Sequence, residues 1–144
     1  MLALPDVNVL VALAWPTHVH HERAHQWLSR QGDAPWATCP LTESGFVRVS
    51  SNTAAIPGAK TPREAIQLLE AILERPHHVF VADDVSIADS RHVAIDRLTG
   101  HRQVTDAHLL GVALKSGAQL ITLDRSLPSL VPSGFERTRV AVIA

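Results

Sequence analysis

The chain has 144 residues, 46% of them hydrophobic and 19% charged, which predicts one folded domain spanning residues 1–144 and excludes a disordered chain. Its formal net charge of −1 excludes binding to nucleic acid through overall basicity, although a basic rim around an acidic site would not show in that sum. The single Cys39 cannot form an intramolecular disulfide, and the nine-residue apolar run VNVLVALAW is too short to span a bilayer, so we expect a cytoplasmic protein without membrane contact.

The first half of the chain predicts two short strands among four helices. The strands are LAL at residues 2–4 and PWATC at residues 35–39. The sequence KTPREAIQLLEAILE predicts the clearest helix, because Thr61 suits the N-cap, Pro62 the first position and Glu64 the third position of a capping box. Apolar periodicity predicts the other three helices, from residue 6 or 7 to about 14, at 18–30 and at 41–50.

The second half continues the alternation of strands and helices. HHVFVADD predicts a strand at 77–84, followed by a helix at about 86–98 and a second helix from Val104 that Gly117 ends. Two more strands are predicted at 118–124 and 138–143. Five short apolar strands separated by helices indicate an α/β fold, a three-layer α/β/α sandwich around a central, mostly parallel five-stranded sheet.

Four carboxylates fall where such a sheet places its ligands. Asp6 and Glu43 follow predicted strands, Asp124 ends one, and Asp106 lies in the first turn of a helix. Because ligands bind beyond the carboxyl ends of parallel strands, we expect these acids to converge on one edge of the sheet. Asp83 and Asp84 also end a strand, and spacing alone does not exclude them from the same site.

Acids gathered in this way predict a cation site. Carboxylates brought together repel one another unless a cation lies among them, and oxygen ligands alone favour Mg²⁺ or Mn²⁺ over zinc. Such a site suits hydrolysis of a phosphodiester by water. Each acid also has an ordinary structural interpretation, since Asp106 could cap a helix, Asp6 or Asp124 could form a turn, and Glu43 could be a solvated helix residue.

Four segments, in order, resemble the acidic motifs of PIN-domain nucleases: LPDVNVLVAL, LTESGFVRV, VTDAHLLGVAL and ITLDRSL. The likeness extends over essentially the whole chain and is closest to the VapC-type toxins of VapBC toxin–antitoxin modules, in the His-rich group common in mycobacteria. It implies a PIN-like fold and a Mg²⁺-dependent endoribonuclease that cleaves a tRNA or rRNA loop. It also implies a homodimer and a cognate VapB-type antitoxin that places a basic side chain in the acidic site.

The resemblance also assigns roles to individual residues. It implies that Asp6 and Asp106 are the principal metal ligands, while Glu43 and Asp124 bind a second ion or hold a water molecule, with no acid of the pattern missing. Further residues are expected to assist: Asn8, Thr105 and Thr122 by orienting the carboxylates, and Arg48 and Arg125 by contacting RNA phosphate.

A competing motif lies in the segment HHERAH, which contains the zinc-protease pattern H-E-x-x-H at His21–His25. The extension that supplies a third ligand in related proteases is absent, because QWLSRQG follows His25. His21 is also expected beside the buried stripe of its helix, formed by Ala24, Trp27 and Leu28, so we interpret it as a packing residue.

Two further functions share the predicted architecture. One is a non-enzymatic receiver-like signalling domain, which usually has paired acids after its first strand and a lysine after a later one. Here the corresponding segments are PDVN and LDRS. The other is a phosphatase with a nucleophilic Asp6, whose acid/base position is occupied by Asn8.

Overall fold

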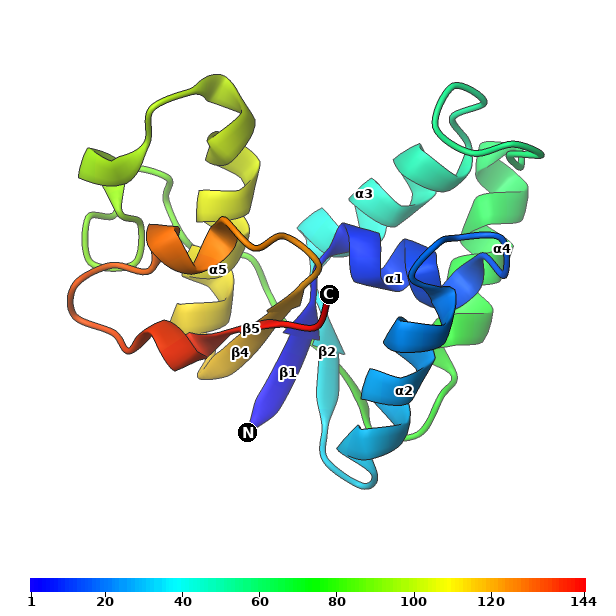
Figure 1. The fold of residues 1–144 in the computed structure, drawn as a ribbon, viewed down its shortest axis with the longest axis horizontal. Helices are drawn as coiled ribbons and strands as arrows, with labels where there is room; N and C mark the ends of the chain where they lie inside the picture. Colours follow the sequence, from blue (N-terminus) through cyan, green and yellow to red (C-terminus); the bar gives the residue numbers. More distant parts are fainter.

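A central sheet of five parallel strands organises the molecule (Figure 1). The computed structural model describes residues 1–144. The strand order is β3-β2-β1-β4-β5 and every neighbouring pair is parallel, so the sheet is wholly rather than mostly parallel. The strands are β1 (Leu2–Pro5), β2 (Trp36–Thr38), β3 (His78–Phe80), β4 (Ala118–Thr122) and β5 (Val140–Val142).

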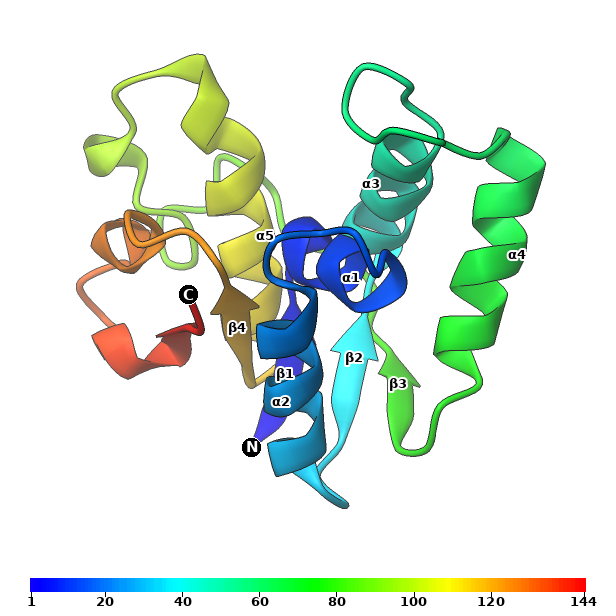
Figure 2. The ribbon, with the colours of Figure 1, turned by 45° about the vertical axis from the view of Figure 1, so that its right-hand side comes forward.

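Helices cover both faces of this sheet, which confirms the three-layer sandwich (Figures 1 and 2). Neighbouring strand residues belong to different cores, with Ala3 and Ile121 in one and Leu4 and Leu120 in the other. This alternation is the period of two expected of a strand buried on both faces. One layer contains α1 (Val7–Ala14), α2 (His21–Gln31), α3 (Pro40–Ser50) and α4 (Pro62–Leu73), and the other contains α5 (Val104–Lys115).

Local sequence signals set the ends of several helices. The Thr61 hydroxyl accepts from the Glu64 backbone N–H at 3.2 Å, while the Glu64 carboxylate accepts from the Thr61 N–H at 3.0 Å. This confirms the predicted capping box. Gly117 follows α5 with a φ of +74°, a conformation that favours glycine, as its predicted role requires. None of the helices is both long and apolar enough to cross a membrane.

The predicted helix at 86–98 is wrong. That segment forms turns and one short 3-10 helix, Ile95–Arg97. The Ser86 hydroxyl accepts from the Ala88 N–H at 3.1 Å, and the Asp89 carboxylate accepts from the Arg91 N–H at 3.0 Å. These side chains satisfy backbone donors locally and so compete with helical hydrogen bonding, which apolar periodicity alone does not reveal.

Helices α1 and α3 approach each other closely at Gly45. A Cβ atom added to this residue would lie 2.5 Å from Cγ2 of Val7 in α1. Real Cβ atoms do not come this close to a neighbouring carbon, so only glycine allows this contact. The contact sets the distance between the N-terminal turn of α1 and the middle of α3.

We expect Gly45→Ala to lower the free energy of unfolding by about 1 kcal/mol or more, because the new methyl group overpacks the contact with Val7. Gly134→Ala is the control, since a Cβ there meets nothing within 4 Å. Urea denaturation of both variants tests this prediction. An equal loss of stability in the two variants would contradict it.

Candidate active site

A pocket of about 360 Å³ opens between α1, α3 and α5 at the carboxyl end of β1. Strand β1 has β2 on one side and β4 on the other, so the chain reverses its strand order here, and α/β folds bind ligands at such points. Figure 2 shows the N-terminal end of α1 between α3 and α5. The lining residues are Asp6, Val7, Asn8, Leu41, Ser44, Gly45, Arg48, Thr105, Asp106 and Leu109.

Asp6 is the most constrained residue of the pocket. It follows β1 and is the N-cap of α1, where its Oδ1 accepts from the Val9 backbone N–H at 3.0 Å. Its Oδ2 accepts from the Thr122 hydroxyl at 2.5 Å, so the last residue of β4 holds the second oxygen. Only 7% of Asp6 is exposed. Two elements distant in the sequence therefore fix one carboxylate, and Thr122 makes the supporting contact expected of it.

The pKa values show that this carboxylate has acidic neighbours. Burial is the main cause that raises the pKa of Asp6 from 3.8 to about 6, against the hydrogen bonds from Thr122 and Val9, and the charges of Asp106 and Asp124 raise it further. The pKa of Asp106 is also raised, first by burial and then by the charge of Asp124. Asp6, Asp106 and Asp124 therefore lie close enough for their charges to interact.

Asp124 lies beside the pocket but does not line it. It is exposed, and its Oδ1 accepts from the Ser126 backbone N–H at 2.8 Å and from the Ser126 hydroxyl at 2.7 Å. Its own N–H donates to the Thr122 hydroxyl oxygen at 3.0 Å. Asp124 thus combines the turn role common after a strand with a charge that acts on the site.

Glu43 does not enter the pocket, so the structure does not bring all four predicted carboxylates together. Its Oε2 accepts from the Thr38 hydroxyl at 2.6 Å, and that hydroxyl oxygen lies 2.8 Å from Nε2 of His78. The neighbouring Ser44 faces the pocket instead. Leu41, Ser44, Gly45 and Arg48 share one face of α3, whereas Glu43 is rotated by about 100° from Ser44 and lines an adjoining pocket with Ser44 and Arg48.

The remaining predicted residues divide into two groups. Asn8, Thr105 and Arg48 line the pocket, and their side chains make no hydrogen bond or ion pair within the protein. Arg125 is exposed and lies outside the pocket lining. The pocket therefore joins two carboxylates, several neutral polar groups and one arginine.

This donor set fits a hard divalent cation bound by two carboxylates. No group of three or more His, Cys, Asp and Glu side chains is arranged to enclose a metal ion. Mg²⁺ does not require such a cage, since it keeps several water ligands and is commonly held by one or two carboxylates. Asp6 and Asp106 are buried or half-buried, carry raised pKa values and face one cavity, so a cation between them would relieve their repulsion.

Two of the three histidines of HHERAH, His21 and His25, form hydrogen bonds to the backbone of α1. Nδ1 of His21 lies 2.7 Å from the Ala12 carbonyl oxygen, and Nε2 of His25 lies 2.9 Å from the Leu13 carbonyl oxygen. A carbonyl oxygen only accepts, so each ring nitrogen carries the proton and donates. The two imidazoles satisfy carbonyls in the last turn of α1, which have no partner within the helix. Both imidazoles therefore cap α1, a role that the sequence did not predict, and His21 packs beside α1 as interpreted from the sequence.

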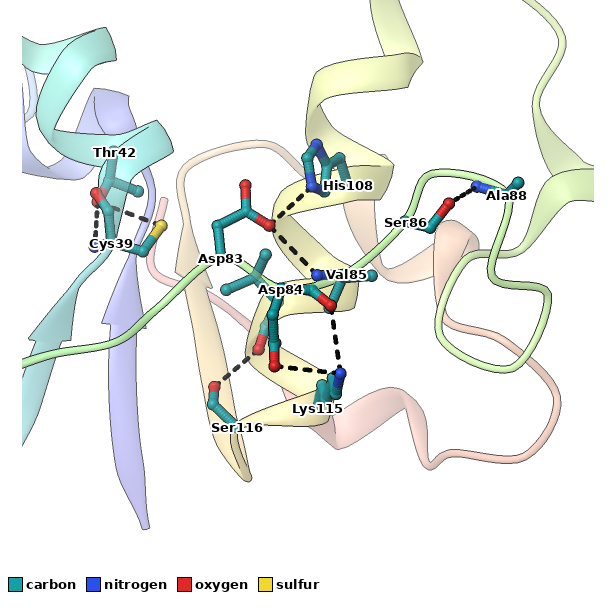
Figure 3. Close-up of polar contacts among 11 residues, drawn as sticks. Cys39, Thr42, Asp83, Asp84, Val85, Ser86, Ala88, His108, Lys115 and Ser116 are labelled. Atoms are coloured by element: carbon teal, nitrogen blue, oxygen red, sulfur yellow. Dashed lines mark hydrogen bonds and ion pairs between the residues drawn. The ribbon is translucent and has the colours of Figure 1, made fainter.

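Asp83 and Asp84 lie in the segment after β3, bind side chains of α5 and do not line the pocket (Figure 3). Asp83 Oδ1 accepts from Nε2 of His108 at 3.0 Å, and Asp84 forms an ion pair with Lys115 at 3.3 Å. Both partners lie on α5. These contacts hold the segment after β3 against α5, and they engage two of the acids that spacing alone left open.

Comparison with known proteins gives consistent matches. Residues 3–130 match the PIN domain family. The chain is 46% identical over 129 residues to ribonuclease VapC38 of Mycobacterium tuberculosis, covering 90% of this chain and 89% of the relative. The fold matches VapBC2 from Rickettsia felis, solved bound to a DNA fragment from its promoter, with a TM-score of 0.63, 12% identity and coverage of 92% and 98% of the two chains. It also matches Mycobacterium tuberculosis VapC20, described as a Sarcin-Ricin loop cleaving toxin, with a TM-score of 0.63, 14% identity and coverage of 90% and 96%.

The raised pKa of Asp6 predicts a pH-dependent stability in the absence of metal. Between about pH 4 and pH 6 the folded state retains a proton that the unfolded state has lost, so the free energy of unfolding falls as the pH rises, by roughly 3 kcal/mol in total. Asp6→Asn keeps one carbonyl oxygen that can accept from the Val9 N–H, and its NH₂ group can donate to the Thr122 hydroxyl oxygen, but the side chain cannot ionise, so it should abolish this fall.

Urea denaturation in EDTA across this pH range measures the effect. Asp96→Asn is the control, because Asp96 is exposed and makes no side-chain hydrogen bond or ion pair. A stability profile of Asp6→Asn that matches the wild type would contradict the assignment of the pH dependence to Asp6.

We expect His21→Ala to lower the free energy of unfolding by about 1 kcal/mol, because the Ala12 carbonyl loses its donor. The loss should be the same with EDTA as with zinc, since the contact is a hydrogen bond to the backbone. Thermal unfolding under both conditions tests this. A loss of stability that appears only with zinc would instead indicate a metal site at HHERAH.

Proposed function

The chain belongs to the PIN-domain family, in its group of VapC ribonucleases, and from this we propose that it is a metal-dependent endoribonuclease and the toxin of a toxin–antitoxin pair. One observation carries the proposal. Asp6 at the end of β1 and Asp106 in the first turn of α5 face the same cavity, and each has a raised pKa. Family membership and this pocket together favour phosphodiester hydrolysis over the receiver and phosphatase functions.

We infer that the bound cation is Mg²⁺ or Mn²⁺ and that Asp6 and Asp106 hold it. When bound, the cation supplies positive charge that polarises a phosphodiester and lowers the pKa of a water molecule. Thr122 keeps the Asp6 carboxylate in one orientation through its 2.5 Å hydrogen bond. Asp124 adds negative charge beside the ion and can hold a water molecule, while Asn8 and Thr105 offer neutral hydrogen-bonding groups to the substrate.

The substrate we propose is a single-stranded loop of tRNA or ribosomal RNA. The pocket between α1, α3 and α5 is open to solvent rather than enclosed, which suits an exposed strand. The structural relative VapC20 is described as cleaving the Sarcin-Ricin loop. Arg48 on the wall of the pocket and Arg125 beside Asp124 are placed to attract RNA phosphates.

We further propose that a VapB-type antitoxin regulates the site and that the toxin forms a homodimer. The matched structure from Rickettsia felis is a VapBC pair, which supports an antitoxin partner for this chain. Asp6 and Asp106 line one pocket, and the pKa of Asp6 is raised, so a positive charge of any kind is favoured there. An arginine or lysine side chain of the antitoxin would therefore compete with the metal ion for the two carboxylates. Inhibition would then require no change of fold.

We expect purified, antitoxin-free protein to cut total cellular RNA into discrete fragments with Mg²⁺ or Mn²⁺ and not with EDTA. Asp106→Asn should lower the cleavage rate by at least about 100-fold, because loss of a metal ligand removes several kcal/mol of transition-state stabilisation. Gel analysis of the fragments measures this, with the exposed Asp96→Asn as the control. Cleavage by Asp106→Asn at the wild-type rate would refute the proposed site.

A further inference from the structure

We propose that a groove between α3 and α4 binds a nucleobase of the RNA, next to the nucleotide that is cut. The inference rests on the proposed nuclease function and concerns how the substrate is bound. Figures 1 and 2 show α3 and α4 side by side. The groove between them has a volume of about 560 Å³ and adjoins the acidic pocket, with which it shares Ser44 and Arg48. Pockets that hold small ring compounds have volumes of about 300–1,000 Å³.

Apolar side chains from both helices line this groove. Val47 belongs to α3, and Ile66 and Leu69 belong to α4. Ile66 is 45% exposed and is the one large apolar residue of α4 that is exposed. The packing of α4 does not account for it, because Ala65, Leu69 and Ile72 form the buried face of that helix. Exposed apolar surface gathered in a hollow is typical of a ligand-binding surface.

Several polar groups of the groove already have partners within the protein. The Ser51 hydroxyl donates to the Val47 carbonyl oxygen at 2.7 Å, and Oε2 of Glu43 accepts from the Thr38 hydroxyl at 2.6 Å. The groove therefore offers a ligand mainly apolar surface, bordered by the two residues that it shares with the acidic pocket. A nucleobase has matching chemistry, since its flat faces stack on apolar side chains and only its edge is polar.

The course of the RNA strand leads to the same groove. A phosphate beside Asp6 and Asp106 would lie in the pocket whose wall includes Ser44 and Arg48, and these two residues also border the groove. A strand that continues on the α3 side of the pocket brings its next nucleotide to the groove. In single-stranded loops the bases are unstacked and turn outward to meet protein surfaces. The base of that nucleotide would then lie against Ile66.

The affinity for RNA with and without bases tests the groove. The probes are a labelled short oligoadenosine and a backbone of the same length without bases, followed by fluorescence anisotropy in EDTA so that the RNA stays intact. Ile66→Ser should bind the oligoadenosine about tenfold more weakly than the wild type and the baseless backbone equally well. Ile87→Ser is the matched control, because Ile87 is 41% exposed and lines neither the pocket nor the groove.

Equal affinities of Ile66→Ser and the wild type for the oligoadenosine would overturn the inference, as would an equal loss for both probes. Ile66→Phe separates base binding from any loss of folding. Its larger flat ring should tighten oligoadenosine binding by about threefold without changing the affinity for the baseless backbone. Weaker oligoadenosine binding by Ile66→Phe, with an unchanged unfolding temperature, would contradict the proposed stacking.

Cleavage separates this inference from the proposed nuclease function. On an RNA that the protein cuts with Mg²⁺, removal of the base at one position next to the cut should lower kcat/KM by about tenfold for the wild type and not for Ile66→Ser. Base-dependent binding without any cleavage would retain the groove and refute the nuclease function. Cleavage that no base removal next to the cut affects would do the reverse.

The same variants distinguish RNA from a protein ligand. Inhibition of cleavage by the antitoxin should be the same for Ile66→Ser and for Ile87→Ser. If Ile66→Ser instead retains both RNA measurements and loses inhibition, the groove is a docking surface for the antitoxin and the inference is wrong.

Discussion

The hydrogen bond between the Thr122 hydroxyl and the Asp6 carboxylate connects the two central strands where their carboxyl ends meet. It is 2.5 Å long and joins residues 116 positions apart. Because Asp6 also caps α1 through Val9, one carboxylate links the end of β1, the end of β4 and the start of a helix. A buried carboxylate is costly unless hydrogen bonds satisfy it, so the fold has to bring these elements together for Asp6 to be accommodated. The raised pKa shows that its hydrogen bonds only partly offset burial.

The same edge of the sheet shows how helix packing selects which side chains reach a site. Gly45 brings α3 close to α1, and the hydrogen bond from Thr38 to Glu43 holds the opposite side of α3. The pocket therefore receives a serine and an arginine from α3, and a carboxylate from α5 through Asp106. Glu43 lies in a motif that resembles the family's, yet its carboxylate accepts from Thr38 at the end of β2 and does not line the pocket of Asp6 and Asp106, because the motif determines only the position of the residue in the chain. Rotation of the helix determines its direction.

Histidine contributes to this molecule mainly through hydrogen bonds to other parts of the protein. His21 and His25 donate to carbonyls at the end of α1, His78 contacts Thr38, and His108 contacts Asp83. The H-E-x-x-H pattern consequently has a structural explanation here: a spacing of four residues places two imidazoles on one face of α2, beside the last turn of α1. Two histidines four residues apart can bind zinc, but they can equally donate to two neighbouring carbonyl oxygens. Here the last turn of α1 supplies those carbonyls, at Ala12 and Leu13.

The sequence by itself determined the α/β class and local features such as the capping box at Thr61, because apolar periodicity and capping residues are short-range signals. It also indicated that Asp6 and Asp106 would lie at the same edge of the sheet, where both line the pocket. It did not determine the course of residues 86–98, where Ser86 and Asp89 bond to nearby backbone and prevent a helix. Nor did it decide that Glu43 would face Thr38 while Ser44 faces the pocket. Only the tertiary structure decided that, because the rotation of α3 depends on contacts with α1, β2 and the core, which are distant in sequence.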